Sequence, residues 1–143
     1  MEERDTKGDV YEVMPFDNTI FTMELTGAEL RRALEDGLRS GRVTQVSGVR
    51  YEFDLDRPRG ERLLSLTLAD GAPLDPSRLY KVACNDFMAT GGDENSVLSG
   101  GRNRNDSGRN VRDAIEVYIA ARSKNGGALN HSPDGRIRRV GER

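Results

Sequence analysis

The sequence is poor in the side chains that build metal centres and disulfides. It has one histidine, His131, and one cysteine, Cys84, among 143 residues. Two-metal hydrolytic sites use several His and Asp ligands, so a single imidazole builds no such site. A lone cysteine forms no internal disulfide, and the position of Cys84 in an apolar alternating run predicts a buried thiol. We assign no metal ligand in this chain.

Motifs for nucleophilic or phosphate-loop chemistry are missing too. There is no Gly-x-Ser-x-Gly elbow, and no histidine lies near Cys84 in the sequence. The pair Gly91-Gly92 is not followed by the Lys-Ser/Thr pair that a phosphate loop requires. We therefore assign no catalytic residue, and a binding role is the better hypothesis.

Long apolar runs and an excess of one charge are also absent. No stretch approaches the about 18 apolar residues of a membrane span, and the start of the chain does not resemble a signal peptide. The formal net charge of -2 does not favour nucleic acid as a partner. A chain of this length buries roughly 70% of its unfolded surface. We expect one domain over residues 1–143, with a frayed start over residues 1–8.

Alternation of apolar and polar residues predicts a series of strands. The predicted strands are Thr19 to Leu25, Val49 to Leu55, Leu64 to Leu68, Leu79 to Cys84 and Arg136 to Val140. Helical patterns lie before, between and after them. We interpret the chain as α+β, with a mixed β-sheet of four or more strands flanked by helices.

Two helices are predicted from their caps. Thr26-Gly27-Ala28-Glu29 reads as a capping box, so a helix is expected from Gly27 to about Ser40-Gly41. Asn110 is expected to cap a final helix that ends near Asn125. Residues 99–110 are polar and rich in glycine, which predicts a mobile loop there.

Two stretches combine the groups that a ligand site needs. The first, Asn85 to Asp93, ends an apolar strand with an aromatic ring, two glycines and a carboxylate. Glycine allows close approach of the backbone, Phe87 offers a flat apolar face, and Asp93 can accept protons from hydroxyl groups. The second stretch, Met14 to Asn18, adds another phenylalanine and an amide.

With further segments, these stretches resemble the C-terminal domain of the 5'-nucleotidases, a family that also includes bacterial UDP-sugar hydrolases and 2',3'-cyclic-nucleotide phosphodiesterases. The resemblance is dense from Gly8 to Asp93 and thin over the last 50 residues. The segments that carry it, in the family's order, are Pro15-Phe16-Asp17-Asn18, Glu24-Leu25-Thr26-Gly27-Ala28-Glu29-Leu30, Gln45-Val46-Ser47-Gly48, Gly60-Glu61-Arg62, Asp75-Pro76-Ser77-Arg78-Leu79-Tyr80-Lys81-Val82 and Asn85-Asp86-Phe87-Met88-Ala89-Thr90-Gly91-Gly92-Asp93.

The resemblance implies that five residues bind a nucleoside. Phe16 and Phe87 correspond to the phenylalanines that clamp the nucleobase, and stacking on an aromatic ring is worth about 1–3 kcal/mol per base. Asn18 matches the asparagine that hydrogen-bonds the base. Asp93 matches the carboxylate that takes the ribose hydroxyls, and Gly41 falls at a glycine near the base.

The sequence departs from the family pattern beside two of these positions. Val43 stands where an aromatic residue is often found, two positions after Gly41. Glu94-Asn95 follows Asp93, where the family usually has glycine and then an aromatic residue. The rim of the site is therefore expected to differ from that of the family.

The resemblance also implies parts that these 143 residues do not supply. In the family, two divalent metals, such as zinc or manganese, and the catalytic His/Asp pair belong to a separate N-terminal metallophosphoesterase domain. We expect this chain to be cut from a longer two-domain enzyme of nucleotide catabolism, to recognise the nucleotide substrate, and to be inactive alone. The parent enzyme is expected to be exported, as a periplasmic, cell-surface or secreted protein.

Structural alternatives remain open at this stage. Phe16 and Phe87 are also suited to a core, Asn18 to a turn cap and Asp93 to ordering its loop. The arginines at 102, 104, 109 and 112 fit either attraction of a phosphate or a solvated loop. As a whole, the domain is alternatively a structural or protein-interaction module that keeps the scaffold but has lost nucleoside binding.

Overall fold

A computed structural model describes residues 17–92, 96–123 and 134–141 of the chain. The predicted frayed start over residues 1–8 lies outside these ranges. The elements, in chain order, are β1 (Thr19–Thr26), α2 (Gly27–Arg39), β2 (Val49–Phe53), β3 (Leu63–Leu68), β4 (Leu79–Asn85), α3 (Asp86–Ala89), α4 (Ser96–Ser99), β5 (Arg102–Asn110), α5 (Val111–Ser123) and β6 (Ile137–Arg139).

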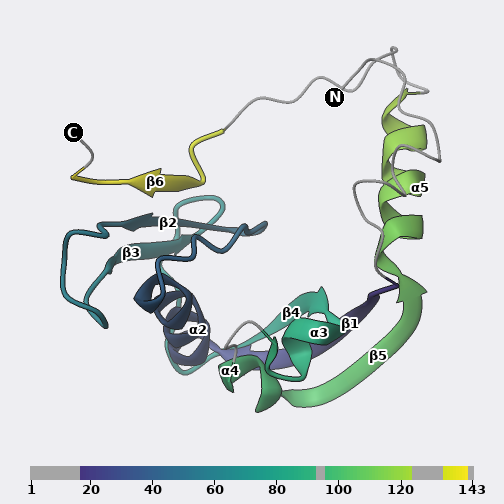
Figure 1. Cartoon of the computed structure of the whole chain (residues 1–143), viewed down its shortest axis with the longest axis horizontal. Coiled ribbons are helices and arrows are strands. Elements are labelled where there is room, and N and C mark those ends of the chain that lie inside the picture. The colour runs from purple at the N-terminus through teal and green to yellow at the C-terminus, as the bar shows by residue number, and fades with distance from the viewer. Residues whose placement is uncertain (1–16, 93–95, 124–133, 142–143) are drawn as a thin grey trace.

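The strands of the described residues form two three-stranded sheets (Figure 1). In the first sheet, β1 lies between β4 and β5 and is antiparallel to both. In the second sheet, β2 lies between β3, its antiparallel partner, and β6, its parallel partner. The α+β class is confirmed, and the five predicted strands are all present, shared between the two sheets.

Helix α2 begins at the residue that the capping box predicts. The Glu29 amide donates to the Thr26 hydroxyl oxygen at 3.1 Å, and the Thr26 amide donates to Glu29 Oε1 at 2.8 Å. Gly27 is needed at the first position, because a Cβ there would lie 2.2 Å from the carbonyl oxygen of Asp75. The helix ends before Gly41, whose φ of +80° is open to glycine at little cost.

One helix serves two apolar clusters. Leu30 and Ala33 of α2 pack against the cluster on the first sheet, and Leu34 and Leu38 belong to the cluster on the second sheet. The first cluster is centred on Met23, Leu25, Ala89, Val97 and Leu98, and the second on Leu34, Leu38, Tyr51, Phe53 and Leu63. In Figure 1, α2 accordingly lies between the β2–β3 pair and the strands of the first sheet.

The expectation of a mobile loop over residues 99–110 is wrong about the secondary structure. Arg102–Asn110 forms β5, which pairs with β1 at the edge of the first sheet. An edge strand needs backbone partners on one side only, so its side chains can stay polar and exposed. The Ser107 hydroxyl adds a bond to the carbonyl oxygen of Ile20 at 2.6 Å. Residues 102–109 are all exposed, which is why no apolar alternation marks the strand.

Helix α5 starts at the predicted cap. Asn110 Oδ1 accepts the backbone amides of Arg112 at 2.8 Å and Asp113 at 3.3 Å. The helix leaves the end of β5 and projects from the body of the domain (Figure 1). Its predicted end near Asn125 lies outside the described residues. The N-terminus of α5 and the start of β1 are neighbours, since the Val111 amide donates to the Asn18 carbonyl oxygen at 2.9 Å.

Candidate nucleoside site

Asn18, a predicted site residue, lies just before β1 and contacts the first residue of α3. Its side-chain Nδ2 donates to Asp86 Oδ1 at 2.8 Å, although 68 positions separate the two residues. The same oxygen accepts the Thr19 backbone amide at 3.2 Å. The hydrogen bond from Asn18 is the main cause that lowers the pKa of Asp86, because it stabilises the charged carboxylate. The pairing of β1 with β4 thus places Asn18 next to the segment that carries Phe87.

The backbone around Asn18 is also held from the side of α5. The Asn18 carbonyl oxygen accepts the Val111 amide, and Asp17 Oδ1 lies 3.0 Å from Arg112 Nη2. The Arg112 side chain is largely buried, whereas that of Asp17 is exposed, so solvent screens the ion pair and it contributes little by itself. Asp86 thus holds the Asn18 side chain and the Thr19 amide, while α5 holds the Asn18 carbonyl oxygen.

Phe87 is a large apolar side chain that the fold leaves in solvent. It is 53% exposed and lies in the short helix α3, after the cap formed by Asn85 Oδ1 and the Met88 amide at 2.7 Å. Two residues further along α3, Ala89 is fully buried. The alternative that Phe87 is a core residue is therefore wrong, because more than half of its surface is open to solvent.

Arg104 of β5 holds the backbone that carries Phe87. Its guanidinium donates to the carbonyl oxygens of Ala89 in α3 and Leu98 in α4, each at 2.6 Å. It also lies 4.8 Å from the centroid of the Phe21 ring, within the range of a cation–π contact. Arg104, one of the four arginines predicted to lie in a loop or to attract a phosphate, therefore connects helices α3 and α4 to the first sheet.

The structure does not bring the other three predicted site residues, Phe16, Gly41 and Asp93, into contact with Asn18 or Phe87 within the described ranges. Phe16 and Asp93 lie outside the described residues, so the base clamp and the ribose contact stay predictions. Gly41 follows α2, with its amide 3.0 Å from the Leu38 carbonyl oxygen and open space where a Cβ would lie. Within the described ranges, no hydrogen bond joins Gly41 to Asn18 or Phe87, and its place near the base also stays a prediction.

Sequence reasoning missed Asp86 and Arg112 as parts of this site. Asp86 is inside the quoted Asn85 to Asp93 stretch, but nothing in the sequence pairs it with a residue 68 positions earlier. The sequence places Arg112 among the arginines of the expected loop, whereas it lies in the first turn of α5. A signal for Asp86 was present: a carboxylate directly before the candidate aromatic residue.

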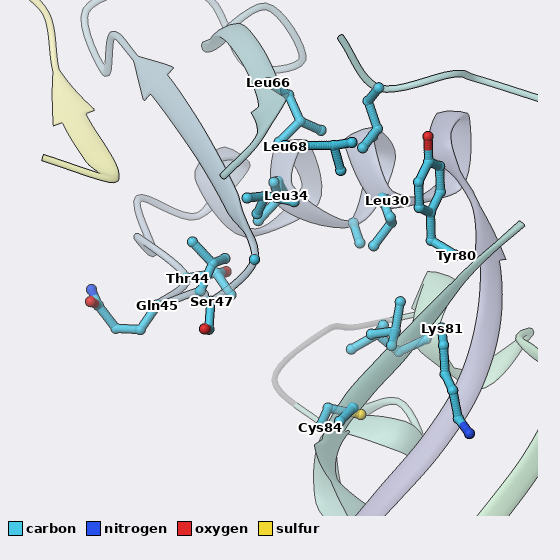
Figure 2. A pocket seen from close by; sticks show the side chains of 18 of the residues that line it. Leu30, Leu34, Thr44, Gln45, Ser47, Leu66, Leu68, Tyr80, Lys81 and Cys84 are labelled. Carbon is cyan, nitrogen blue, oxygen red and sulfur yellow. The ribbon is translucent and has the colours of Figure 1, made fainter. Parts of the chain in front are cut away.

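The described structure also has a large groove, which neither Asn18 nor Phe87 borders. It has a volume of about 480 Å³ and runs between α2, β4, β3 and the segment before β2 (Figure 2). Its lining is mostly apolar, and none of Asn18, Gly41 and Phe87 borders it. Burial raises the pKa of the Cys84 thiol there, and Figure 2 shows the Lys81 side chain running away from the groove. We therefore locate the candidate site by its polar groups at Asn18 and α3, and not by this hollow.

Neither a metal-binding cluster nor a membrane-spanning helix is found in residues 17–92, 96–123 and 134–141. These residues contain no group of three or more His, Cys, Asp or Glu side chains that could hold a metal ion. No helix in the same ranges is both long and apolar enough to cross a membrane.

Comparison with known proteins supplies the family. Residues 6–100 match the family model of the 5'-nucleotidase C-terminal domain. The chain belongs to this family. The 5'-nucleotidase precursor of Thermus thermophilus is 37% identical and superposes over 97% of the chain with a TM-score of 0.88. The NAD nucleotidase of Haemophilus influenzae is 21% identical over 94%, with a TM-score of 0.80, and supports the fold alone.

The relatives of this 5'-nucleotidase C-terminal domain are much longer proteins. The trifunctional nucleotide phosphoesterase protein YfkN of Bacillus subtilis is 33% identical over 94% of the chain, which spans 10% of that protein. A 5'-nucleotidase of Diplobatis ommata is 34% identical over 75% of the chain, which spans 21% of its length. In the Thermus thermophilus structure the chain covers 28% of the polypeptide. The chain thus corresponds to a C-terminal domain of multidomain 5'-nucleotidase-family enzymes.

Proposed function

We propose that this domain recognises the nucleoside part of a nucleotide for a 5'-nucleotidase-type phosphohydrolase. In this proposal the base lies between the rings of Phe16 and Phe87, and Asn18 hydrogen-bonds its edge. Asp93 takes the ribose hydroxyls, and the backbone at Gly41 approaches the base. Stacking suits the task because every nucleobase has a π face.

The observation that carries the proposal is the pairing of an exposed ring with a fixed amide. Phe87 is 53% exposed, and the residue before it, Asp86, holds the Asn18 amide at 2.8 Å. An exposed apolar ring and a polar amide that are held by adjacent residues suit ligand recognition, in which apolar contact gives affinity and a few polar groups give orientation. Fixing both groups before binding lowers the entropy lost on association.

We further propose that hydrolysis takes place on another domain. The relatives are about four to ten times longer than the part that matches, which leaves room for a metallophosphoesterase domain with two divalent metals such as zinc or manganese. The present domain then contributes specificity and positioning. It is expected to release no phosphate from AMP alone, even with added Mn²⁺ or Zn²⁺.

Export of the parent enzyme is proposed on the names of relatives. These include snake venom 5'-nucleotidases of Macrovipera lebetinus and Naja atra and a cell wall protein of Listeria monocytogenes. Extracellular nucleotides are the substrates that an exported enzyme of this kind meets.

Titration of adenosine and AMP into the isolated chain tests the proposal. We expect a Kd of about 1 mM to about 100 µM, because stacking and a few hydrogen bonds must outweigh the cost of association. Phe87→Ala should abolish this binding. Leu79→Ala is the matched control, because Leu79 is also an exposed apolar residue (44%) but lies at the opposite end of β4.

The outcomes separate the two candidate functions. Equal affinity of Phe87→Ala and the unchanged chain removes Phe87 from the site. Absence of binding by any nucleoside up to millimolar concentration, with circular dichroism showing an intact fold, favours the interaction-module alternative.

A further inference from the structure

The Asn18 side chain has a fixed orientation that follows from the chemistry of its neighbour. An amide can face another group with either its nitrogen or its oxygen, whereas an ionised carboxylate only accepts hydrogen bonds. Asp86 Oδ1 lies 2.8 Å from Asn18 Nδ2 and also accepts the Thr19 amide. The lowered pKa of Asp86 keeps this carboxyl charged at neutral pH. The amide nitrogen must therefore point to Asp86.

The opposite side of the amide is consequently an acceptor. Within the described part of the chain, no hydrogen bond reaches Asn18 Oδ1, and Nδ2 keeps its second N–H. The Asn18 carbonyl oxygen is bound to the Val111 amide, which helps to hold the backbone that carries this side chain. In the proposed site, a base that stacks on Phe87 is expected to meet an amide whose oxygen and nitrogen positions Asp86 has set.

We propose that Asp86 is a specificity-determining positioning residue, which holds the Asn18 amide so that its oxygen accepts a hydrogen bond from an N–H group on the edge of the bound nucleobase. This inference rests on the proposed nucleoside site and adds to it the class of base that is favoured. Bases with an N–H on the edge that meets Asn18, such as the amino group of adenine, satisfy the oxygen. Purine without a 6-substituent offers only ring nitrogens there, which are acceptors and face the oxygen unfavourably.

Asp86→Ala is the variant that tests the orientation. An alanine at this position has no acceptor for the Asn18 Nδ2 group or the Thr19 amide, both of which Asp86 Oδ1 binds. The Asn18 amide is then able to turn and present its nitrogen to the ligand. Asp70→Ala is the matched control, because Asp70 Oδ1 accepts the backbone amide of Ala72 at 2.9 Å in an exposed turn after β3.

The measurement is the affinity ratio of adenosine to purine riboside for the unchanged chain and both variants. We expect adenosine to bind about tenfold more tightly to the unchanged chain, the usual effect of one hydrogen bond together with relief of an unpaired acceptor. The ratio should fall to about twofold or less in Asp86→Ala and stay unchanged in Asp70→Ala. Equal ratios in the unchanged chain and Asp86→Ala overturn the inference while leaving the nucleoside site in place.

Nuclear magnetic resonance of the side-chain amide gives a readout that needs no ligand. One Asn18 Nδ2 proton should be shifted downfield and should follow the titration of Asp86, and both the shift and this dependence should vanish in Asp86→Ala. An Asn18 signal that does not respond to Asp86 overturns the fixed orientation, whatever the nucleosides do. If the signal responds but neither nucleoside binds, the proposed function itself fails, and the role of Asp86 in base recognition fails with it.

Discussion

Gly92 lies against the ring of Phe87 so closely that no side chain fits between them. A Cβ at position 92 would be 2.5 Å from Cδ1 and Cε1 of the ring and 2.6 Å from Cζ. Carbon atoms do not approach so closely, since contacts are optimal near about 3.5–4.0 Å. The absence of a side chain at Gly92 therefore allows the Phe87 ring to lie where it does. This ring is the apolar face of the proposed site.

Gly92→Ala should move the Phe87 ring and weaken nucleoside binding. We expect the affinity for adenosine to fall by about tenfold, because the stacking face would no longer lie where the Asn18 amide meets the base. Binding can be followed by the same titration as for Phe87→Ala. Gly100→Ala is the control, since a Cβ there lies at an ordinary 3.6 Å from the nearest atom. Unchanged affinity in Gly92→Ala means that the position of the ring does not govern binding.

Arg104→Ala should destabilise the fold and loosen the segment that carries Phe87. The guanidinium bonds the Ala89 and Leu98 carbonyl oxygens, and a hydrogen bond from a charged donor contributes about 1.5–3 kcal/mol. Because Arg104 is partly in solvent, we expect a loss of about 1–2 kcal/mol in the free energy of unfolding, measured by urea denaturation.

Two further variants separate this effect from the loss of a charge. Arg104→Lys keeps the charge but lacks the planar fork that reaches two carbonyl oxygens, so it should recover only part of the stability. Arg109→Ala removes an exposed arginine from the same strand and should have little effect on unfolding. Equal stabilities for Arg104→Ala and Arg109→Ala contradict the structural role of Arg104.

Glu29 should make the stability of the domain depend on pH. Hydrogen bonds from the Arg102 side chain and the Thr26 amide lower the pKa of Glu29 from 4.5 to about 2. A carboxyl whose pKa is lower in the folded state stabilises the fold above its unfolded pKa, and this contribution is lost as the pH falls toward the folded value. The affected window therefore runs from about pH 4.5 down to about pH 2.

Glu29→Gln should remove this part of the pH dependence. Glutamine can still accept the Thr26 amide in the capping box but carries no titrating group. The midpoint of urea denaturation should fall less steeply between about pH 5 and about pH 3 than in the unchanged chain. Glu61→Gln, at an exposed position, should retain the full slope. A Glu29→Gln slope equal to that of the unchanged chain contradicts the link between Glu29 and acid stability.

Local signals in the sequence predicted much of the fold. The Thr26 capping box set the start of α2, the Asn110 cap set the start of α5, and apolar alternation marked β1 to β4. These features depend on residues a few positions apart, so the sequence displays them directly. The prediction of a loop at Arg102–Asn110 was wrong for the opposite reason. Strand β5 is stabilised by backbone pairing with β1, and its side chains show no apolar alternation.

These local signals do not predict contacts between residues that are far apart in the sequence. The division of the strands into two sheets depends on which edges meet, and alternation within a strand does not encode that. For the candidate site, the family resemblance predicts Asn18 and Phe87, but the hydrogen bond between Asn18 and Asp86 became visible only through the pairing of β1 with β4. The mutual position of Phe16 and Phe87 remains a prediction, since Phe16 lies outside the described residues.

The position of α2 has a consequence for how the domain comes apart. Leu30 and Ala33 pack on the first sheet, while Leu34 and Leu38 are embedded in the second. Detaching the helix from either sheet opens both interiors to water at once, so the two halves should melt together in a single cooperative transition.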